Sequence, residues 1–454
     1  MTVMFGTGIR LEIRDAEAAP DQIRTMTRPL RIAIAGLGTV GGGVVKALTV
    51  RRSELAERAG RSLDVVAVSA RDKSKPRGVD VSAIDWSIDP AALARTNAEV
   101  VVELIGGEDG VARALIEAAL DAGKHVVTAN KALLARHGAG LAAKAEAKGL
   151  ALKFEAAAAG GIPIVKALRE SLIAHGINSV CGILNGTCNF ILTEMEKSGR
   201  PFAEVLKDAQ ALGYAEADPT LDVGGGDTAD KLALLSSLAF GTVPDLEHMH
   251  VEGIAHITPE DIRYAREFGF RIKLLGVARR IDGGIEQRVQ PAMVRAGTPL
   301  GEVSGPFNAV AVDAGEAGPF FFEGRGAGAG PTASAVIADL VDIALGSFEP
   351  AFGKPARTLT PLVPAAPTAA SSAYYLRFDV LDIPGVVAEI AGHLAQAGVS
   401  IESMLQRGRN PGEAVSIVMI THETPQASVA RALKAIATSD KVRGRPGMIP
   451  MEAG

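Results

Sequence analysis

The spacing of apolar and polar positions divides this chain into short buried strands and amphipathic helices. Apolar runs occupy residues 30–35 (LRIAIA), 63–69, 100–104 (VVVEL) and 125–128, and a helical pattern spans 109–122. Strands that are apolar on both faces are typical of parallel sheets covered by helices on both sides. This part of the chain therefore predicts an α/β fold with a doubly wound parallel sheet.

The pattern becomes more mixed after residue 150. It predicts a strand at 151–155, a helix at 165–175, a strand at 178–184, a loop at 185–189 and a helix from Phe190 onward. Asn and Thr at the junction of that strand and helix are suitable helix caps. This order indicates a second domain of the α+β class.

A third pattern follows a stretch rich in Pro, Ala, Thr and Ser at 351–372, which marks a boundary. Beyond it, the sequence predicts elements in the order βαββα, at 374–380, 386–397, 401–406, 414–420 and 428–437. The domain plan is a disordered extension at 1–28, a nucleotide-binding domain at 29–150, an α+β domain at 151–350, a linker at 351–372 and a βαββα domain at 373–454.

A glycine motif follows the first strand directly, and a helical run follows the motif. It reads Gly36-Leu37-Gly38-Thr39-Val40-Gly41. G-x-G-x-x-G in this position is the dinucleotide fingerprint of Rossmann-type folds, since its glycines let the backbone approach a pyrophosphate at a helix amino terminus. Lys131 follows a later strand at the same edge, which makes it a candidate site residue, although lysines at loop ends are mostly solvated.

The end of the second strand bears on the choice of cofactor. Arg71, Asp72 and Lys73 lie there, where an acid favours the ribose hydroxyl of NAD and a base accepts the 2′-phosphate of NADP. Arg71 and Lys73 favour NADP, while Asp72 leaves NAD open.

A segment rich in carboxylates and turn residues lies at 213–231 (GYAEADPTLDVGGGDTADK). Gly224 to Gly226 can supply a positive φ, Asp227 can cap the next helix, and Asp230 completes a capping-box pattern. Lys231 lies four residues after Asp227 on the same helical face, at the start of an almost wholly apolar helix. A solvated ion pair and a buried functional lysine are both compatible with this pattern.

Composition narrows the class of protein. The 454 residues have a net charge of −5 with 22% charged residues, which gives no reason to expect a nucleic-acid or anionic-membrane partner. Two cysteines cannot form a disulfide framework or a four-ligand metal site, so a cytoplasmic location is expected. No apolar run approaches the ~20 residues that cross a bilayer, and the first 28 residues lack the apolar core of a secretory signal.

These motifs together resemble homoserine dehydrogenase over residues 30 to 345. The resemblance rests on GLGTVGGG, TANKALL, FEAAAAGGIPI, GILNGTCNFIL, LGYAEADPTLDVGGGDTADKLALL and GRGAGAGPTASAV. It implies NAD(P)H-dependent reduction of L-aspartate 4-semialdehyde to L-homoserine by a homodimer or homotetramer, with the α+β domain serving catalysis and dimerisation. The βαββα unit, with its D-x-P-G-V turn, resembles an ACT domain, which implies threonine as a feedback inhibitor; a purely dimerising role is the alternative.

The resemblance also implies roles for individual residues. Lys231 is the expected proton donor and Lys131 a second catalytic lysine beside the nicotinamide, while Glu216, Asp222 and Asp227 bind the substrate. The expected cofactor contacts are Gly36, Leu37, Gly38, Thr39, Val40, Arg71, Ile105, Gly106, Lys131 and Gly328. The expected sodium ligands are Glu155 and the carbonyl groups of Ala158, Gly160 and Ile162.

Two alternatives remain at this point. Cys188 stands where the family's N-G-T-x-N loop more often has threonine, and a cysteine nucleophile would indicate a thioester-forming semialdehyde dehydrogenase. No histidine follows it in a matching motif, so Cys188 is interpreted as a small packing residue. A non-catalytic amino-acid sensor is the second alternative, and it would not need the matched set of Lys131, Glu216, Asp227 and Lys231.

Overall fold

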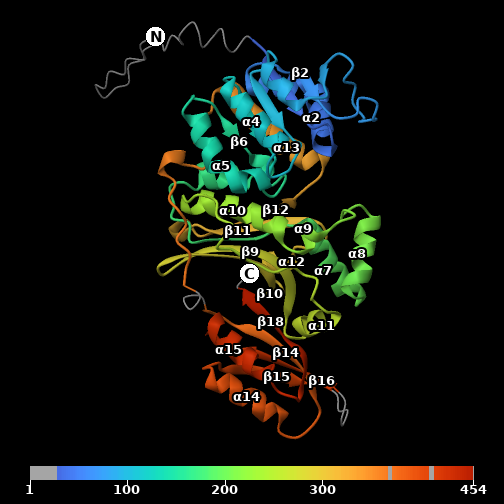
Figure 1. Cartoon of the computed structure of the whole chain (residues 1–454), viewed down its shortest axis with the longest axis vertical. Coiled ribbons are helices and arrows are strands. Elements are labelled where there is room, and N and C mark those ends of the chain that lie inside the picture. Colours follow the sequence, from blue (N-terminus) through green and yellow to red (C-terminus); the bar gives the residue numbers. More distant parts are fainter. Residues whose placement is uncertain (1–27, 367–370, 408–413, 453–454) are drawn as a thin grey trace, which may run out of the picture.

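The computed structural model describes residues 28–366, 371–407 and 414–452, arranged as three units stacked along the long axis (Figure 1). The expected disordered extension at 1–28 lies, apart from Arg28, outside the described residues. No helix within the described part of the chain has the length and apolar character that a membrane crossing requires.

The first unit is built on a six-stranded parallel sheet of order β3-β2-β1-β4-β5-β6, which confirms the predicted fold class. Its elements are β1 (Leu30–Ala35), α2 (Thr39–Val50), α3 (Arg52–Ala59), β2 (Leu63–Ser69), β3 (Asp85–Ser87), β4 (Val100–Glu103), α4 (Val111–Asp121), β5 (His125–Thr128), α5 (Lys131–Glu146) and β6 (Leu152–Lys153).

Strand β1 shows why both faces of this sheet are covered. Its even positions, Leu30, Ile32 and Ile34, pack with residues of α2, while Ala33 and Ala35 pack with residues of α4 and α5. The strand order reverses between β1 and β4, so their carboxyl ends open a crevice, which is where such sheets bind ligands.

The second unit contains a mixed sheet with helices on one face (Figure 1). Its elements are β7 (Ser179–Ile183), α7 (Gly186–Ser198), α8 (Phe202–Ala211), α9 (Thr220–Val223), α10 (Gly226–Phe240), β8 (His250–Val251), α11 (Pro259–Glu267), β9 (Phe270–Ile281), β10 (Gly284–Arg295), α12 (Pro299–Glu302), β11 (Phe307–Asp313), β12 (Pro319–Arg325) and α13 (Ala329–Leu345). Helix α13 crosses back and packs against α2 of the first unit.

Two predicted boundaries in this unit were wrong. The helix expected at 165–175 is a short helix, α6 (Ile164–Lys166), that widens into a π-helical turn at Ala167–Ser171. Helix α7 begins at Gly186 rather than Phe190, because the Asn185 side chain accepts the Cys188 N–H at 2.8 Å. The residues expected to form a loop are therefore the first turn of α7.

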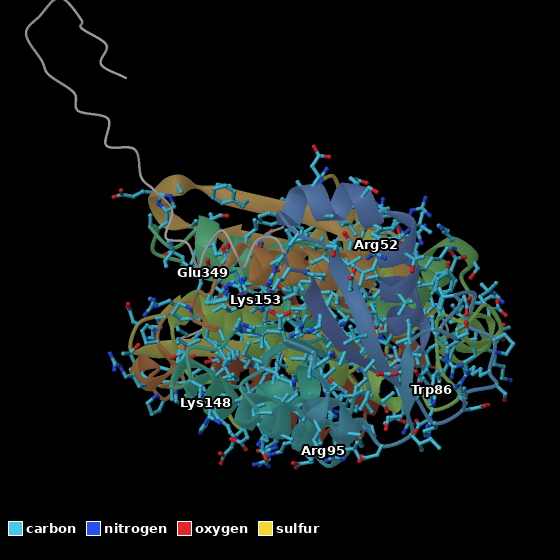
Figure 2. All side chains as sticks on the ribbon, turned by 90° about the horizontal axis from the view of Figure 1, so that it is seen from above. Arg52, Trp86, Arg95, Lys148, Lys153 and Glu349 are labelled. Carbon is cyan, nitrogen blue, oxygen red and sulfur yellow. The ribbon has the colours of Figure 1, made fainter. Side chains whose placement is uncertain are left out.

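A buried charge cluster joins the returning helix α13 to the first unit. Lys153 of β6 is 1% exposed, and its Nζ lies 3.2 Å from Asp342 and 2.9 Å from Glu349. Figure 2 shows Lys153 and Glu349 on the side of the sheet away from Trp86, which lies on the other edge strand, β3.

The C-terminal unit has the predicted βαββα order and three further strands. Its elements are β13 (Ser371–Ser372), β14 (Tyr374–Leu381), α14 (Val386–Gln396), β15 (Ile401–Gln406), β16 (Ala414–Thr421), β17 (Thr424–Pro425), α15 (Gln426–Ile436) and β18 (Val442–Glu452). Strand β18 was not predicted. It pairs with β14 and, in parallel, with β10, where Met451 faces Met293, so both units share one ten-stranded sheet.

Candidate functional site

The site is organised around the first turn of α10. Gly225 is its N-cap and has a φ of 89°, which reverses the chain after α9 at little steric cost. The expected cap was wrong, because the Asp227 side chain does not cap the helix but points at two lysines, and Asp230 binds Arg136 instead of completing a capping box. Lys231 Nζ lies 2.6 Å from Asp227 Oδ2 and donates to the Leu184 carbonyl at 2.7 Å.

The second lysine comes from the first unit. Asn130 caps α5, and Lys131 at the start of this helix places its Nζ 3.2 Å from Asp227 Oδ1. Burial alone would raise the pKa of Asp227, but Lys231 and Lys131 outweigh it and lower that pKa to about 2. Burial opposes the charge of Lys131 as well, yet Asp227 outweighs burial and raises the Lys131 pKa. One ionised carboxylate thus holds two ammonium groups across the two units.

A further carboxylate is attached to this cluster through Asn185. The Asn185 amide donates to Asp222 Oδ1 at 2.7 Å and to Asp227 Oδ2 at 2.9 Å, while its own oxygen caps α7. Burial raises the pKa of Asp222, and the negative charge of Asp227 adds to this, although the Asn185 bond lowers it. Asn185 therefore fixes the distance between two acids that would otherwise repel each other.

These groups line a cavity of about 520 Å³ between the two units. The expected site residues on its wall are Val40, Lys131, Gly160, Asp222, Asp227, Lys231 and Gly328. Glu216 is exposed and is not on this wall, although Gly213 and Tyr214 of the same turn are. The structure thus brings both lysines and two of the three expected substrate-binding acids to one cavity.

The glycine motif adjoins the same cavity. Gly36 has a φ of 96°, and a Cβ there would lie 2.4 Å from the Leu104 carbonyl oxygen; a Cβ at Gly41 would lie 1.9 Å from the Gly36 oxygen. Gly38 is the N-cap of α2, with open space beside it. Its neighbours Leu37 and Thr39 are buried and exposed, respectively. The motif therefore leaves a free helix amino terminus at the crevice, as a pyrophosphate requires.

The loop after β4 is held by a carboxylate. Glu103 is fully buried, and its Oε1 accepts the N–H groups of Ile105 at 2.7 Å and Gly106 at 3.0 Å, while Oε2 accepts the Thr128 hydroxyl at 2.7 Å. This arrangement turns the Ile105–Gly106 loop toward the crevice beside Gly36.

The end of β2 carries exposed charges. Arg71 is exposed, and Asp72 accepts bonds from both the backbone N–H and the hydroxyl of Ser74, which lower its pKa. Arg77 stacks on Trp86, with its guanidinium carbon 5.1 Å from the ring centre. The Asp72 carboxylate therefore bonds within its own loop, whereas the neighbouring Arg71 and Lys73 are exposed.

The expected cation loop is buried next to the cavity. Glu155 accepts the N–H groups of Val165 at 3.1 Å and Lys166 at 2.8 Å, and burial followed by the nearby charge of Asp339 raises its pKa to about 8. Ala158 is fully buried, and the Ile162 carbonyl accepts the Ile164 N–H at 2.8 Å. A buried carboxylate with a strongly raised pKa is a group that a bound cation would hold in its ionised form.

Comparison with known proteins agrees with this geometry. The family model described as homoserine dehydrogenase matches residues 163–341, that of its NAD-binding domain matches 36–155, and that of the ACT domain matches 374–438. A homoserine dehydrogenase of Neisseria gonorrhoeae is 45% identical over 94% of this chain and 99% of its own length. One of Pseudomonas aeruginosa is 43% identical over 92% of this chain and 97% of its own length.

The chain belongs to the homoserine dehydrogenase family. It is an oxidoreductase with an NAD-binding domain and a C-terminal ACT domain. The crystal structure of a homoserine dehydrogenase from Thiobacillus denitrificans matches it with a TM-score of 0.88 and 43% identity, over 94% of this chain and 99% of that chain.

Sequence analysis missed three residues of this homoserine dehydrogenase site. Asn185 was seen only as a cap, Glu103 only as part of a buried strand, and Arg136 was not considered. A glutamate ending an otherwise apolar strand was a usable signal, since unpaired buried carboxylates are costly. Arg136 had no such signal, because its partner Asp230 is 94 residues away in sequence.

The structure also bears on Cys188. This residue is fully buried, and its Sγ donates to the Asp222 carbonyl at 3.3 Å. Burial, followed by the charges of Asp222 and Asp227, raises the pKa of the thiol well above its usual value. A thiol in this state carries little thiolate at neutral pH, so its environment is the opposite of the one that activates a nucleophile.

We therefore predict that Cys188→Ser keeps homoserine oxidation within about threefold of the parent, since serine retains a donor to the Asp222 carbonyl. The measurement is steady-state kcat with saturating homoserine, and Cys181→Ser is the control for a partly buried thiol away from the cavity. Abolished turnover with unchanged cofactor binding would support the thioester alternative instead.

Proposed function

We propose that this chain catalyses the NAD(P)H-dependent reduction of L-aspartate 4-semialdehyde to L-homoserine, in the aspartate pathway to threonine, methionine and isoleucine. The observation that carries the proposal is the pair of lysine ammonium groups on Asp227, at a cavity that Val40 and Gly328 of the nucleotide-binding loops also line. The test is a steady-state assay of homoserine oxidation by the purified chain with each nicotinamide cofactor. An absence of turnover with both cofactors would favour the non-catalytic sensor.

Gly36, Gly38, Ile105, Gly106 and Gly328 would hold the cofactor, which would supply the hydride for the aldehyde carbon when bound. Negative charge then develops on the aldehyde oxygen, and a cation that can release a proton stabilises that charge and completes the alcohol. We assign this proton transfer to Lys231. Its ammonium group is held in a fixed direction by Asp227 and the Leu184 carbonyl, so it needs little reorganisation at the moment of reaction.

Lys131 has a different part in this proposal. Its raised pKa makes it a poor proton donor near neutral pH, but a stable positive charge beside the reacting oxygen. Asp222, positioned by Asn185, would attract the substrate ammonium group. Glu216 belongs to the same turn as the cavity-lining Tyr214, and we assign it a second contact to this ammonium group.

We further propose that Glu155 and the carbonyl groups of Ala158, Gly160 and Ile162 hold a monovalent cation, most simply Na⁺. No cluster of three or more His, Cys, Asp or Glu side chains able to hold a metal occurs in the described part of the chain, so this site relies on carbonyl oxygens. The cation would keep Glu155 ionised and would fix the loop that contains Gly160 on the cavity wall.

Replacement of Lys231 tests the proton donor. We predict that Lys231→Met lowers kcat by about 10²-fold to 10⁴-fold, the range of general acid catalysis, while the Kd of NADPH changes by less than about threefold. Stopped-flow turnover and fluorescence titration measure the two quantities, with Lys131→Met in parallel. An equal fall of kcat and cofactor affinity in Lys231→Met would make Lys231 structural and Lys131 the preferred donor.

Arg71 tests the proposed preference for NADP. Because Asp72 is turned toward Ser74, the exposed Arg71 is the expected partner of the 2′-phosphate. We predict that Arg71→Glu raises the KM for NADPH at least tenfold and leaves the KM for NADH within about threefold. Arg95→Glu is the matched control, since Arg95 is also exposed but ends the short helix that leads to the amino end of β4, whereas Arg71 follows the carboxyl end of β2. Equal changes for both cofactors in Arg71→Glu would contradict the assignment.

We also propose that the enzyme is a cytoplasmic homodimer or homotetramer and that its ACT domain binds threonine as a feedback inhibitor. The turn before α14, where Gly385 has a φ of 93°, and the Gly398 loop are the expected pocket.

We predict that threonine inhibits the full-length enzyme and that Gly385→Val removes the inhibition, because valine is strained at a positive φ. The measurement is homoserine oxidation against threonine concentration. A point variant is preferable to removal of residues 373–454, since removal would strip β18 from β10. Gly444→Val, at a positive φ in β18, is the control, and an unchanged inhibition curve in Gly385→Val would refute this pocket.

A further inference from the structure

One buried side chain on the cavity wall, that of Asn308, has no role in the proposed mechanism. Asn308 of β11 is 1% exposed and lines the same cavity as Lys131 and Asp222. Neither its Nδ2 nor its Oδ1 has a hydrogen-bond partner among the described residues. An unsatisfied buried polar group costs about 1–3 kcal/mol, so an amide with both ends unpaired requires an explanation.

Other buried asparagines around the site are satisfied. Asn185 binds Asp222 and Asp227, Asn130 donates to the Gly107 carbonyl, and the amide of Asn189 donates to two backbone carbonyls. Asn308 is therefore the exception among these asparagines, and it lines the cavity.

Two glycines fix the position of the Asn308 amide. A Cβ at Gly326 would lie 2.1 Å from Asn308 Cγ, and a Cβ at Gly186 would lie 3.4 Å from Asn308 Oδ1. The amide thus packs between the start of α7 and the loop that leads to α13, with no room for a larger residue at Gly326. An amide held in this way is preorganised, so ligand binding costs little conformational entropy of the side chain.

The polar side chains nearest the reaction already have a part in the proposed mechanism. Lys131 and Lys231 bind Asp227, and the Asn185 amide binds Asp222 and Asp227. The acids Asp222 and Asp227 attract an ammonium group and repel a carboxylate, so the two ends of an amino-acid substrate need different partners. The Asn308 amide offers an uncharged donor for the carboxylate end.

We propose that Asn308 is a substrate-binding residue whose Nδ2 donates to the α-carboxylate of the amino-acid substrate. This inference rests on the proposed function, because it assigns one contact within that substrate site. It makes Asn308 a determinant of specificity for substrates that carry an α-carboxylate over amino alcohols that lack one.

The test compares two buried amides of the same chain. Asn308→Leu is expected to raise the KM for homoserine at least tenfold, with kcat within about threefold and the KM of the cofactor unchanged. Gln287→Leu is the matched control, since Gln287 is 5% exposed with both amide atoms unpaired but lies on β10, away from this cavity. Its KM for homoserine is expected to stay within about twofold.

Two further measurements identify the group that is bound. Asn308→Asp keeps the size of the side chain but replaces the donor by a negative charge, so its KM for homoserine should exceed that of Asn308→Leu. The probe 3-aminopropan-1-ol, which is homoserine without its carboxylate, should inhibit the parent and Asn308→Leu with inhibition constants within about twofold of each other.

The proposal is overturned by any of three results. These are an unchanged KM in Asn308→Leu and Asn308→Asp, an equal loss of affinity for homoserine and 3-aminopropan-1-ol, or a matching KM increase in Gln287→Leu. Failure of the proposed function gives a different result, because the parent enzyme would then oxidise no homoserine with either cofactor.

Discussion

The single carboxylate of Asp227 is the constraint on which the site depends. It lies buried in the first turn of α10, where the helix dipole favours a negative charge, and it binds one lysine from its own helix and one from α5. Removing one partner from a buried ion pair costs about 3–5 kcal/mol, far more than an exposed pair is worth. The nucleotide-binding unit and the second unit are therefore joined at the atoms to which the proposed mechanism assigns the chemistry, rather than only at a distant interface.

A second ion pair reinforces this joint. Arg136 of α5 lies 2.9 Å from the buried Asp230 of α10 and 2.8 Å from Glu108, which follows the loop held by Glu103. Arg136 thus links three segments whose relative position decides where Lys131 points. Within the second unit, the Asn185 amide has a similar positioning role, because it bonds to both Asp222 and Asp227 and fixes the distance between them. The reactive groups are few, and most of the polar contacts around them serve to position them.

The fold could be predicted from the sequence wherever a local pattern decides the structure. Strands β1, β2 and β5 and the order of the C-terminal elements were predicted correctly, because apolar runs and turn residues specify them locally. The capping role of Asp227 was wrong because its partner Lys131 is 96 residues away, and tertiary attraction overrides a local preference. Strand β18 was missed for a similar reason, since it pairs with two strands, β14 and β10, and β10 lies more than 150 residues upstream.

The shared sheet connects the C-terminal unit directly to the second unit, which bears on the proposed regulation. The ACT unit is joined to the catalytic sheet through the pairing of β18 with β10, and Glu452 at the end of β18 binds Arg288 of β10. Thr258 caps α11, while Asp261 completes its capping box and also accepts a bond from Arg377 of β14 at 2.8 Å. A ligand that shifts β14 against β18 would therefore act on β10 and α11 together. Since a ligand changes an equilibrium only by its differential affinity for two arrangements, the proposed regulation would require contacts such as these to differ between the two arrangements.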